Sequence, residues 1–202
     1  MKKAGSGPQL FFASIPFIFA FQQITEGFLW LALTHSEWQF LRSPDTYNFL
    51  FFAQVVWPFW VPFSIYKLEQ NATRKKLQRL IVYIGATVSL FLACCLLFLH
   101  VEAKVDGQHI HYQQDYPYAL STYGGFLYVI ATIVPPFLSG IRQMWSLGLA
   151  ILISYIITEL FYEHYIVSVW CFFASVISAA VLAVIWQLKK ESRVNAPFYS
   201  SH

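Results

Sequence analysis

Long apolar blocks separated by short polar stretches make up most of this chain. An apolar run of about 18 or more residues is typical of a transmembrane helix, because about 20 residues at 1.5 Å each cross a hydrocarbon core of about 30 Å. Only 11% of the residues are charged and 57% are hydrophobic, whereas soluble domains carry about 25% charged residues. The pattern predicts an all-α, polytopic membrane helix bundle.

Six blocks have the length of a membrane span. We expect transmembrane helices at residues 9–33, 46–66, 77–99, 119–139, 144–161 and 164–188. Residues 1–188 would then form a single transmembrane helical domain, and residues 189–202 a polar cytoplasmic tail. The polar segment 100–118 is expected to be an exposed, hydrophilic loop. Its His100, His109 and His111 do not complete a closed set of metal ligands, so the sequence assigns no metal site.

The short loops indicate how the helices are oriented. The segment after the second expected span carries five basic residues, which are Lys67, Arg74, Lys75, Lys76 and Arg79. Cytoplasmic loops of membrane proteins are enriched in lysine and arginine, so we expect a cell-membrane protein with both termini in the cytoplasm. The lipid bilayer is its expected partner. The net charge of +3 is spread over loops and tails and therefore indicates no nucleic-acid partner.

The first apolar block contains a polar face within the stretch FAFQQITEGFLW. At 100° per residue, Gln22, Gln23, Glu26, Gly27 and Trp30 lie within an arc of about 140°. An acidic residue that faces lipid near the helix centre costs about 2.5–3.5 kcal/mol. We therefore expect this face to point into the bundle, with Gly27 allowing another helix to approach closely.

Other expected spans carry polar residues at a similar depth, in the outer half of the membrane. We predict one outward-opening polar pocket that binds a ligand, formed by Gln22, Gln23, Glu26, Trp30, Gln54, Tyr155, Glu159, His164 and Ser168. Ionisable residues within membrane spans usually mark a functional site.

Two motifs resemble those of an uncharacterised family of bacterial multi-pass membrane proteins. The first is Gln-Gln-x-x-Glu-Gly-x-x-Trp at positions 22–30, and the second is His-Tyr-x-x-Ser-Val-Trp-Cys-Phe at positions 164–172. The resemblance spans most of the chain and implies no established activity. Such proteins usually carry another hydrophobic segment before the first motif, so the resemblance also allows a seven-helix family whose first helix is missing here.

Three classes of function fit these observations. The first is a protein that binds or transports a small polar or amphipathic ligand in the pocket. The second is an intramembrane, metal-dependent, hydrolase-like enzyme that uses Glu26, Glu159, His164 and Ser168. The position four residues after His164 is a serine, however, and not a second histidine. The third is a structural membrane subunit whose polar face ties helices together. The sequence identifies no cofactor for any of them.

Overall fold

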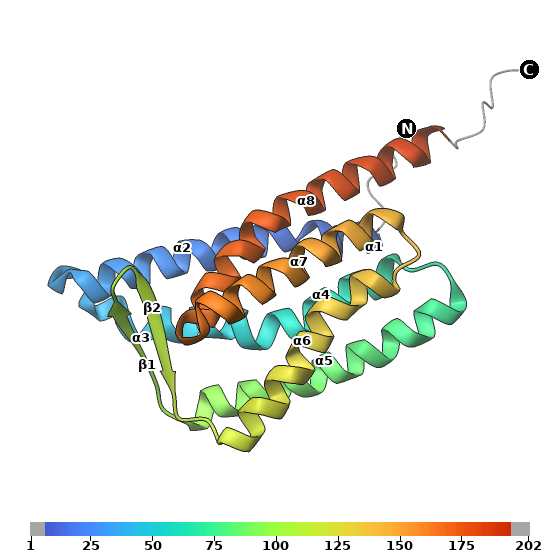
Figure 1. Ribbon diagram of the computed structural model, residues 1–202. Coiled ribbons are helices and arrows are strands. Elements are labelled where there is room, and N and C mark those ends of the chain that lie inside the picture. Colours follow the sequence, from blue (N-terminus) through green and yellow to red (C-terminus); the bar gives the residue numbers. More distant parts are fainter. Residues whose placement is uncertain (1–6, 195–202) are drawn as a thin grey trace, which may run out of the picture.

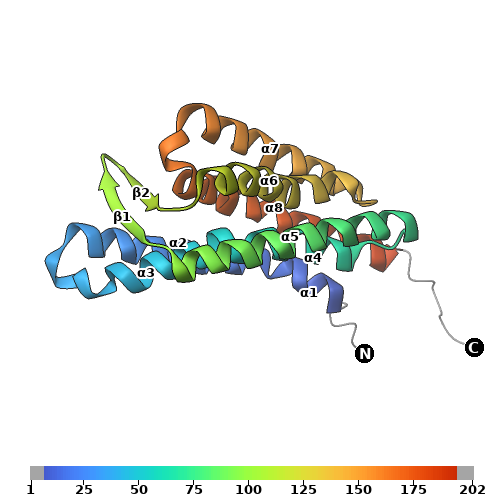
Figure 2. The ribbon, with the colours of Figure 1, turned by 90° about the horizontal axis from the view of Figure 1, so that it is seen from below.

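The computed structural model describes residues 7–194, except the side chains of residues 118–122 and 188–194. Within this part, the chain forms eight α-helices and one two-stranded β-hairpin (Figure 1). The hairpin lies at one end of the helix bundle, and the start of α1 and the end of α8 lie at the other end, in both views (Figure 1 and Figure 2). We call these the hairpin end and the terminal end.

The elements follow one another with few long connections. Helices α1 (Gly7–Ala13) and α2 (Ile15–Thr34) are separated at Ser14. The next apolar block comprises the 3₁₀ helix η1 (Ser36–Leu41), α3 (Arg42–Leu50), the π-helix η2 (Phe51–Val56) and α4 (Trp57–Leu68). The remaining elements are α5 (Ala72–Phe98), β1 (Val101–Asp106), β2 (His109–Gln114), α6 (Tyr118–Leu138), α7 (Arg142–Phe161), the 3₁₀ helix η3 (Glu163–Tyr165) and α8 (Ile166–Val194).

Five helical segments in the described residues are long and apolar enough to cross a membrane, namely Gly7–Thr34, Ser36–Leu68, Ala72–Phe98, Arg142–Phe161 and Glu163–Gln187. They match five of the six expected spans. The expected span at residues 119–139 corresponds to α6, whose searched apolar part, Tyr123–Leu138, is shorter. Helix α8 continues through the start of the expected tail to Val194, and the rest of that tail lies outside the described residues.

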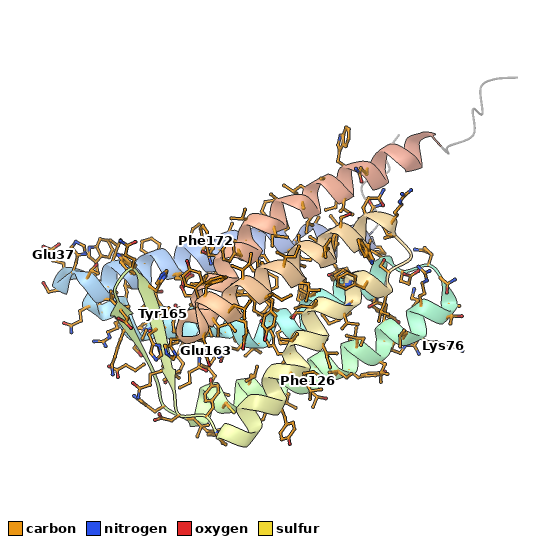
Figure 3. All side chains as sticks on the ribbon, in the orientation of Figure 1. Glu37, Lys76, Phe126, Glu163, Tyr165 and Phe172 are labelled. Atoms are coloured by element: carbon orange, nitrogen blue, oxygen red, sulfur yellow. The ribbon has the colours of Figure 1, made fainter. Side chains whose placement is uncertain are left out.

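The outer surface of the bundle is apolar, which confirms a membrane protein. Phe98 is 81% exposed, Leu97 77% and Phe161 76%. Phe126, which Figure 3 labels on α6, is 65% exposed. Water would make such a surface prone to association, whereas lipid solvates it.

Proline and glycine fix the contact between α4 and α5. Pro62 has no N–H group, so the carbonyl of Pro58 lacks the helical donor four residues later. Gly85 of α5 lies directly against this carbonyl oxygen, because a Cβ atom at position 85 would overlap it. Nearer the start of α5, the buried Gln78 donates from Nε2 to the Pro135 carbonyl oxygen of α6 at 2.7 Å. The prolines in these helices are therefore matched by specific partners on α5.

The segment expected to be an exposed loop is a β-hairpin that packs against the helices, so this prediction was wrong. Strands β1 and β2 pair antiparallel across a turn in which Gly107 has a φ of 62°. Ala103 and Ile110 are almost completely buried, in a cluster that includes Leu29 and Phe49 of the bundle. Burial of alternate residues on one face of the strands explains why the hairpin is ordered.

Charged and polar contacts hold the hairpin to the hairpin end of the bundle. Arg42 of α3 forms an ion pair with Glu102 at 3.0 Å and donates to the Ala103 carbonyl oxygen at 3.3 Å. The Tyr165 hydroxyl donates to Asp106 at 2.6 Å, beside the turn. The hairpin is therefore anchored at α3 and again at the junction between α7 and α8.

A buried acidic residue joins two turns at the terminal end. The Glu69 carboxylate, at the end of α4, accepts from the Asn71 backbone N–H at 2.9 Å and from the Gly140 N–H at 2.7 Å. Arg74 donates to the Ser139 carbonyl oxygen at 3.0 Å. These bonds connect the α4–α5 turn to the α6–α7 turn, and they fix the bundle at the end opposite the hairpin.

Candidate functional site

A cleft of about 470 Å³ lies at the hairpin end, between α2, α8 and the tip of the hairpin. Its walls carry part of each sequence motif. The α2 wall contributes Gln23, Glu26, Gly27 and Trp30, the α8 wall contributes Ser168, Val169, Phe172 and Phe173, and the remaining lining residues are Gln108, His109, Ile110 and Tyr162. Figure 3 labels Phe172 near the start of α8, where this helix passes α2 in that view.

The helical repeat explains the α2 wall. Gln23, Glu26, Gly27 and Trp30 are spaced i, i+3, i+4 and i+7, so they lie on one stripe of the helix. A Cβ atom added at Gly27 would meet no atom within 4 Å. The expectation that Gly27 allows another helix to approach closely was therefore wrong. The missing side chain leaves open space in the cleft instead.

Glu26 is the acidic group of the cleft, and its partners are neutral. The Tyr112 hydroxyl, from β2, donates to Glu26 Oε1 at 3.4 Å. The side chains of Ser168 and Gln23 also interact with the Glu26 carboxylate. No lysine or arginine lines the cleft, and within residues 7–187 no ion pair involves Glu26. The cleft thus holds one carboxylate without a basic counter-ion.

The hairpin supplies the part of the site that lies outside the membrane spans. Tyr112 is buried and stacks on Phe49 of α3, with ring centroids 5.0 Å apart and an interplanar angle of 7°. Burial and the neighbouring Glu26 carboxylate both raise the pKa of Tyr112 well above its usual value, because each disfavours a phenolate. Tyr112 therefore stays a hydrogen-bond donor to Glu26.

The turn of the hairpin packs against the start of α8. The His109 ring lies 4.9 Å from the Tyr165 ring and 5.4 Å from the Tyr162 ring. His111 Nδ1 is 2.9 Å from the backbone carbonyl oxygen of His164. These contacts hold His109 and its neighbours over the cleft.

Gln22 points to a different part of the bundle from Gln23. Gln22 is fully buried, and its Oε1 accepts from Trp57 Nε1 at 2.6 Å. Trp57 also stacks on Phe19, with centroids 3.7 Å apart. Successive residues of a helix are rotated by 100°, so only one of the two adjacent glutamines can face the cleft. Gln22 instead joins α2 to α4.

Gln54 belongs to another polar contact, in the π-helix η2. Its Nε2 donates to Gln114 at 2.9 Å, and its Oε1 accepts from the Tyr116 hydroxyl at 3.0 Å. The Tyr128 hydroxyl of α6 donates to the Ala53 carbonyl oxygen at 2.5 Å. The backbone bonds of a π-helix run to the fifth residue, and side chains from β2 and α6 support this irregular segment.

The other three predicted residues do not line the cleft either. The Tyr155 ring packs on the Trp170 ring at 5.1 Å, and its hydroxyl interacts with the exposed Glu159. The His164 side chain is exposed at the α7–α8 junction. Of the nine predicted residues, the cleft brings together four, which are Gln23, Glu26, Trp30 and Ser168.

An apolar cavity of about 70 Å³ lies deeper in the bundle, between α1, α2, α4, α6, α7 and α8. Phe19, Trp57, Tyr128 and Cys171 are among the residues that line it. No group of three or more His, Cys, Asp or Glu side chains in the described residues is arranged to hold a metal ion. The polar chemistry of the site is therefore centred on Glu26.

The fold and the apolar surface define a multi-pass helical membrane protein with a cleft at one end. The chain belongs to the family of unknown function DUF6629, whose model matches residues 2–197. No curated protein and no solved structure matches the chain significantly. The expected membership of an uncharacterised membrane-protein family is confirmed.

Proposed function

We propose that this protein binds a small polar or amphipathic ligand in the cleft between α2 and α8. The observation that carries the proposal is the arrangement of the walls. The polar stripe of α2 faces the start of α8 across a cleft of about 470 Å³, and Gly27 keeps that space free. Ligand sites combine apolar walls with a few converging polar groups, and Glu26 and Ser168 are such groups here.

The proposed orientation places the cleft on the outer side of the cell membrane. Most basic residues in the described part of the chain are at the terminal end, and Arg74, Lys75 and Lys76 lie in the first turns of α5 there. The hairpin end carries Arg42 and Lys104. The positive-inside rule then puts the terminal end in the cytoplasm.

Cysteine labelling tests the orientation and the openness of the cleft. Gly27→Cys, in a chain whose exposed Cys94 is replaced by serine, should react in intact cells with a membrane-impermeant thiol reagent. Gly125→Cys on α6 is the matched control, because Gly125 also has no neighbour within 4 Å of its Cβ position but does not line the cleft. Labelling of Gly27→Cys only from the cytoplasmic side would contradict an outward opening.

Ligand-observed NMR tests whether the cleft binds small molecules. The probes are a mixture of small water-soluble amines, alcohols and carboxylates, applied to the protein in nanodiscs. We expect at least one compound to bind the wild type and Gly125→Leu but not Gly27→Leu, whose side chain fills the cleft. If no compound distinguishes Gly27→Leu from Gly125→Leu, the cleft is not a ligand site.

A second candidate, a structural membrane subunit, is favoured by Gln22 and Gln54. Both make hydrogen bonds between elements, to Trp57 and to Gln114 and Tyr116. Such bonds contribute about 0.6 kcal/mol each on average in membrane proteins. They account for these two glutamines without a ligand, but they do not account for the open space beside Glu26.

A further inference from the structure

Among its described lining residues the cleft has one acidic group, Glu26, and no lysine or arginine. The Tyr112 phenol donates to Glu26, the Ser168 hydroxyl interacts with it, and the Gln23 amide lies beside it; none of these groups carries a charge. A carboxylate that is withdrawn from water is costly unless a cation pairs with it. With no lysine or arginine in the described lining, a cation or a proton from solution can balance this carboxylate.

The walls around Glu26 are aromatic. Trp30, Tyr162, Phe172 and Phe173 all line the same cleft. The face of an aromatic ring is electron-rich and attracts ammonium groups, and such rings around an acidic residue are a recurring way to bind organic cations. Apolar rings would not replace the water or oxygen ligands of Mg²⁺ or Ca²⁺, so an inorganic divalent ion does not suit these walls.

Charge also excludes an anionic ligand. The cleft is lined by no lysine or arginine in the described residues, and a ligand carboxylate or phosphate would lie beside Glu26. His109 also lines the cleft, but its ring is held by contacts with the rings of Tyr162 and Tyr165. A neutral ligand would leave a proton as the group that balances Glu26, whereas a cationic ligand would balance the carboxylate directly.

We propose that the cleft recognises an organic ammonium group, with Glu26 as its counter-ion and the rings of Trp30, Tyr162 and Phe173 around it. This inference rests on the proposed function of the cleft as a ligand site. An alkylammonium can reach the cleft as a free solute or as the headgroup of a lipid, and the recognising chemistry is the same for both.

Choline and its uncharged isostere 3,3-dimethylbutan-1-ol form a matched pair of probes. They have the same branched shape, and only choline carries a positive charge. In nanodiscs of phosphatidylglycerol, we expect choline to bind the wild type at least about tenfold more tightly than the isostere does. Equal affinities would overturn the ammonium proposal and would leave a ligand-binding cleft in place.

Two acidic residues provide the matched variants. Glu26→Gln removes the charge from the cleft and should weaken choline binding by at least about tenfold. Glu159→Gln removes a charge from the exposed face of α7 and should leave choline binding unchanged. Equal weakening by both variants would overturn the role of Glu26. Should Glu26→Gln fail to fold, the comparison of choline with its isostere on the wild type still decides the question.

Gly27→Leu separates failure of this inference from failure of the proposed function. Choline that binds Gly27→Leu as well as the wild type binds outside the cleft, which would overturn the ammonium inference. The proposed function falls with it only if the NMR screen also finds no compound that distinguishes Gly27→Leu from Gly125→Leu. No choline binding up to roughly 10 mM, together with Gly27-dependent binding of a neutral or anionic compound in the NMR screen, would overturn only the ammonium inference.

Repeating the choline titration in phosphatidylcholine nanodiscs distinguishes a free ammonium solute from a lipid headgroup as the natural ligand. Weaker apparent binding of free choline there indicates that the lipid headgroup competes for the cleft. Equal binding in both lipids indicates a free ammonium compound. Both results support ammonium recognition.

Discussion

Gly85→Ala tests the contact between α4 and α5, which fixes the helices around the site. A Cβ atom at position 85 would overlap the Pro58 carbonyl oxygen and would lie 2.9 Å from the Pro58 carbonyl carbon and 3.2 Å from Pro62 Cγ. Two of these three atoms belong to the backbone, and the third belongs to a rigid ring. None of them can rotate away, so the helices have to separate.

The two opposing effects of Gly85→Ala can be compared. Replacing a helical glycine by alanine gains about 0.5–1 kcal/mol in helix propensity. Overpacking a close contact costs about 1–3 kcal/mol and occasionally more. We expect a net destabilisation of about 1–2 kcal/mol, which corresponds to a lower Tm by about 2–8 °C for a chain of this size.

Thermal unfolding in nanodiscs measures this effect, with Gly125→Ala as the control. An alanine at position 125 meets no atom within 4 Å, so that variant should keep or slightly raise the Tm. A Gly85→Ala protein whose Tm equals that of Gly125→Ala would refute the steric reasoning.

Two further predictions concern the polar groups near the site. Gln22→Ala leaves Trp57 Nε1 without its acceptor, so we expect it to lower the free energy of unfolding by about 1–2 kcal/mol. Gln23→Ala should lower it by less than about 0.5 kcal/mol. Equal losses for the two variants in equilibrium unfolding would refute the different roles of Gln22 and Gln23. Tyr112 has a folded-state pKa raised by burial and by Glu26 above the usual value of 10.0, so the stability it contributes is complete below pH 10 and is lost as the pH rises beyond it. The difference in unfolding free energy between wild type and Tyr112→Phe should therefore fall by about 1.4 kcal/mol per pH unit above pH 10, and a pH-independent difference would contradict the raised pKa.

The sequence predicted the helix bundle well because the signal for a membrane helix is local in the sequence. Apolar blocks identify membrane helices without reference to their neighbours, and five such segments are present. The periodicity of α2 likewise places Glu26 and Trp30 on one face, and the structure puts both in the cleft. Periodicity alone did not separate Gln22 from Gln23, because a broad polar arc can face two different neighbours.

Depth in the membrane predicts less well than helical periodicity which residues share a site. Depth alone groups Glu159 with Glu26, because both lie near the same ends of their expected spans. The structure places Glu159 on an exposed face of α7, because depth says nothing about how a helix is rotated or which helices are adjacent. The contacts that fix rotation, such as Pro58 against Gly85, are long-range and cannot be read from one sequence.

The hairpin was missed although the sequence carries its signal. Asp106-Gly107 is a common turn pair, and on one side of it Val101 and Ala103 alternate with the polar residues Glu102 and Lys104. This alternation of period two predicts a half-buried strand. Finding the hairpin would also have suggested that residues of β2 approach the site, where Tyr112 meets Glu26.

The π-helix η2 (Phe51–Val56) holds one residue more than a regular α-helix would need over the same stretch. Because a π-helical turn carries about one residue more than an α-helical turn, the extra residue is taken up within the segment. A deletion of one residue that let the segment become a regular α-helix would therefore leave α4 with nearly the same rotation relative to α3. If the segment became α-helical with all its residues kept, α4 would turn by about 100°, and Trp57 would leave Phe19 and Gln22 although no residue of either contact had been changed. The packing of α4 thus depends on the π-helical turn itself, which the side chains of Gln114 and Tyr128 support.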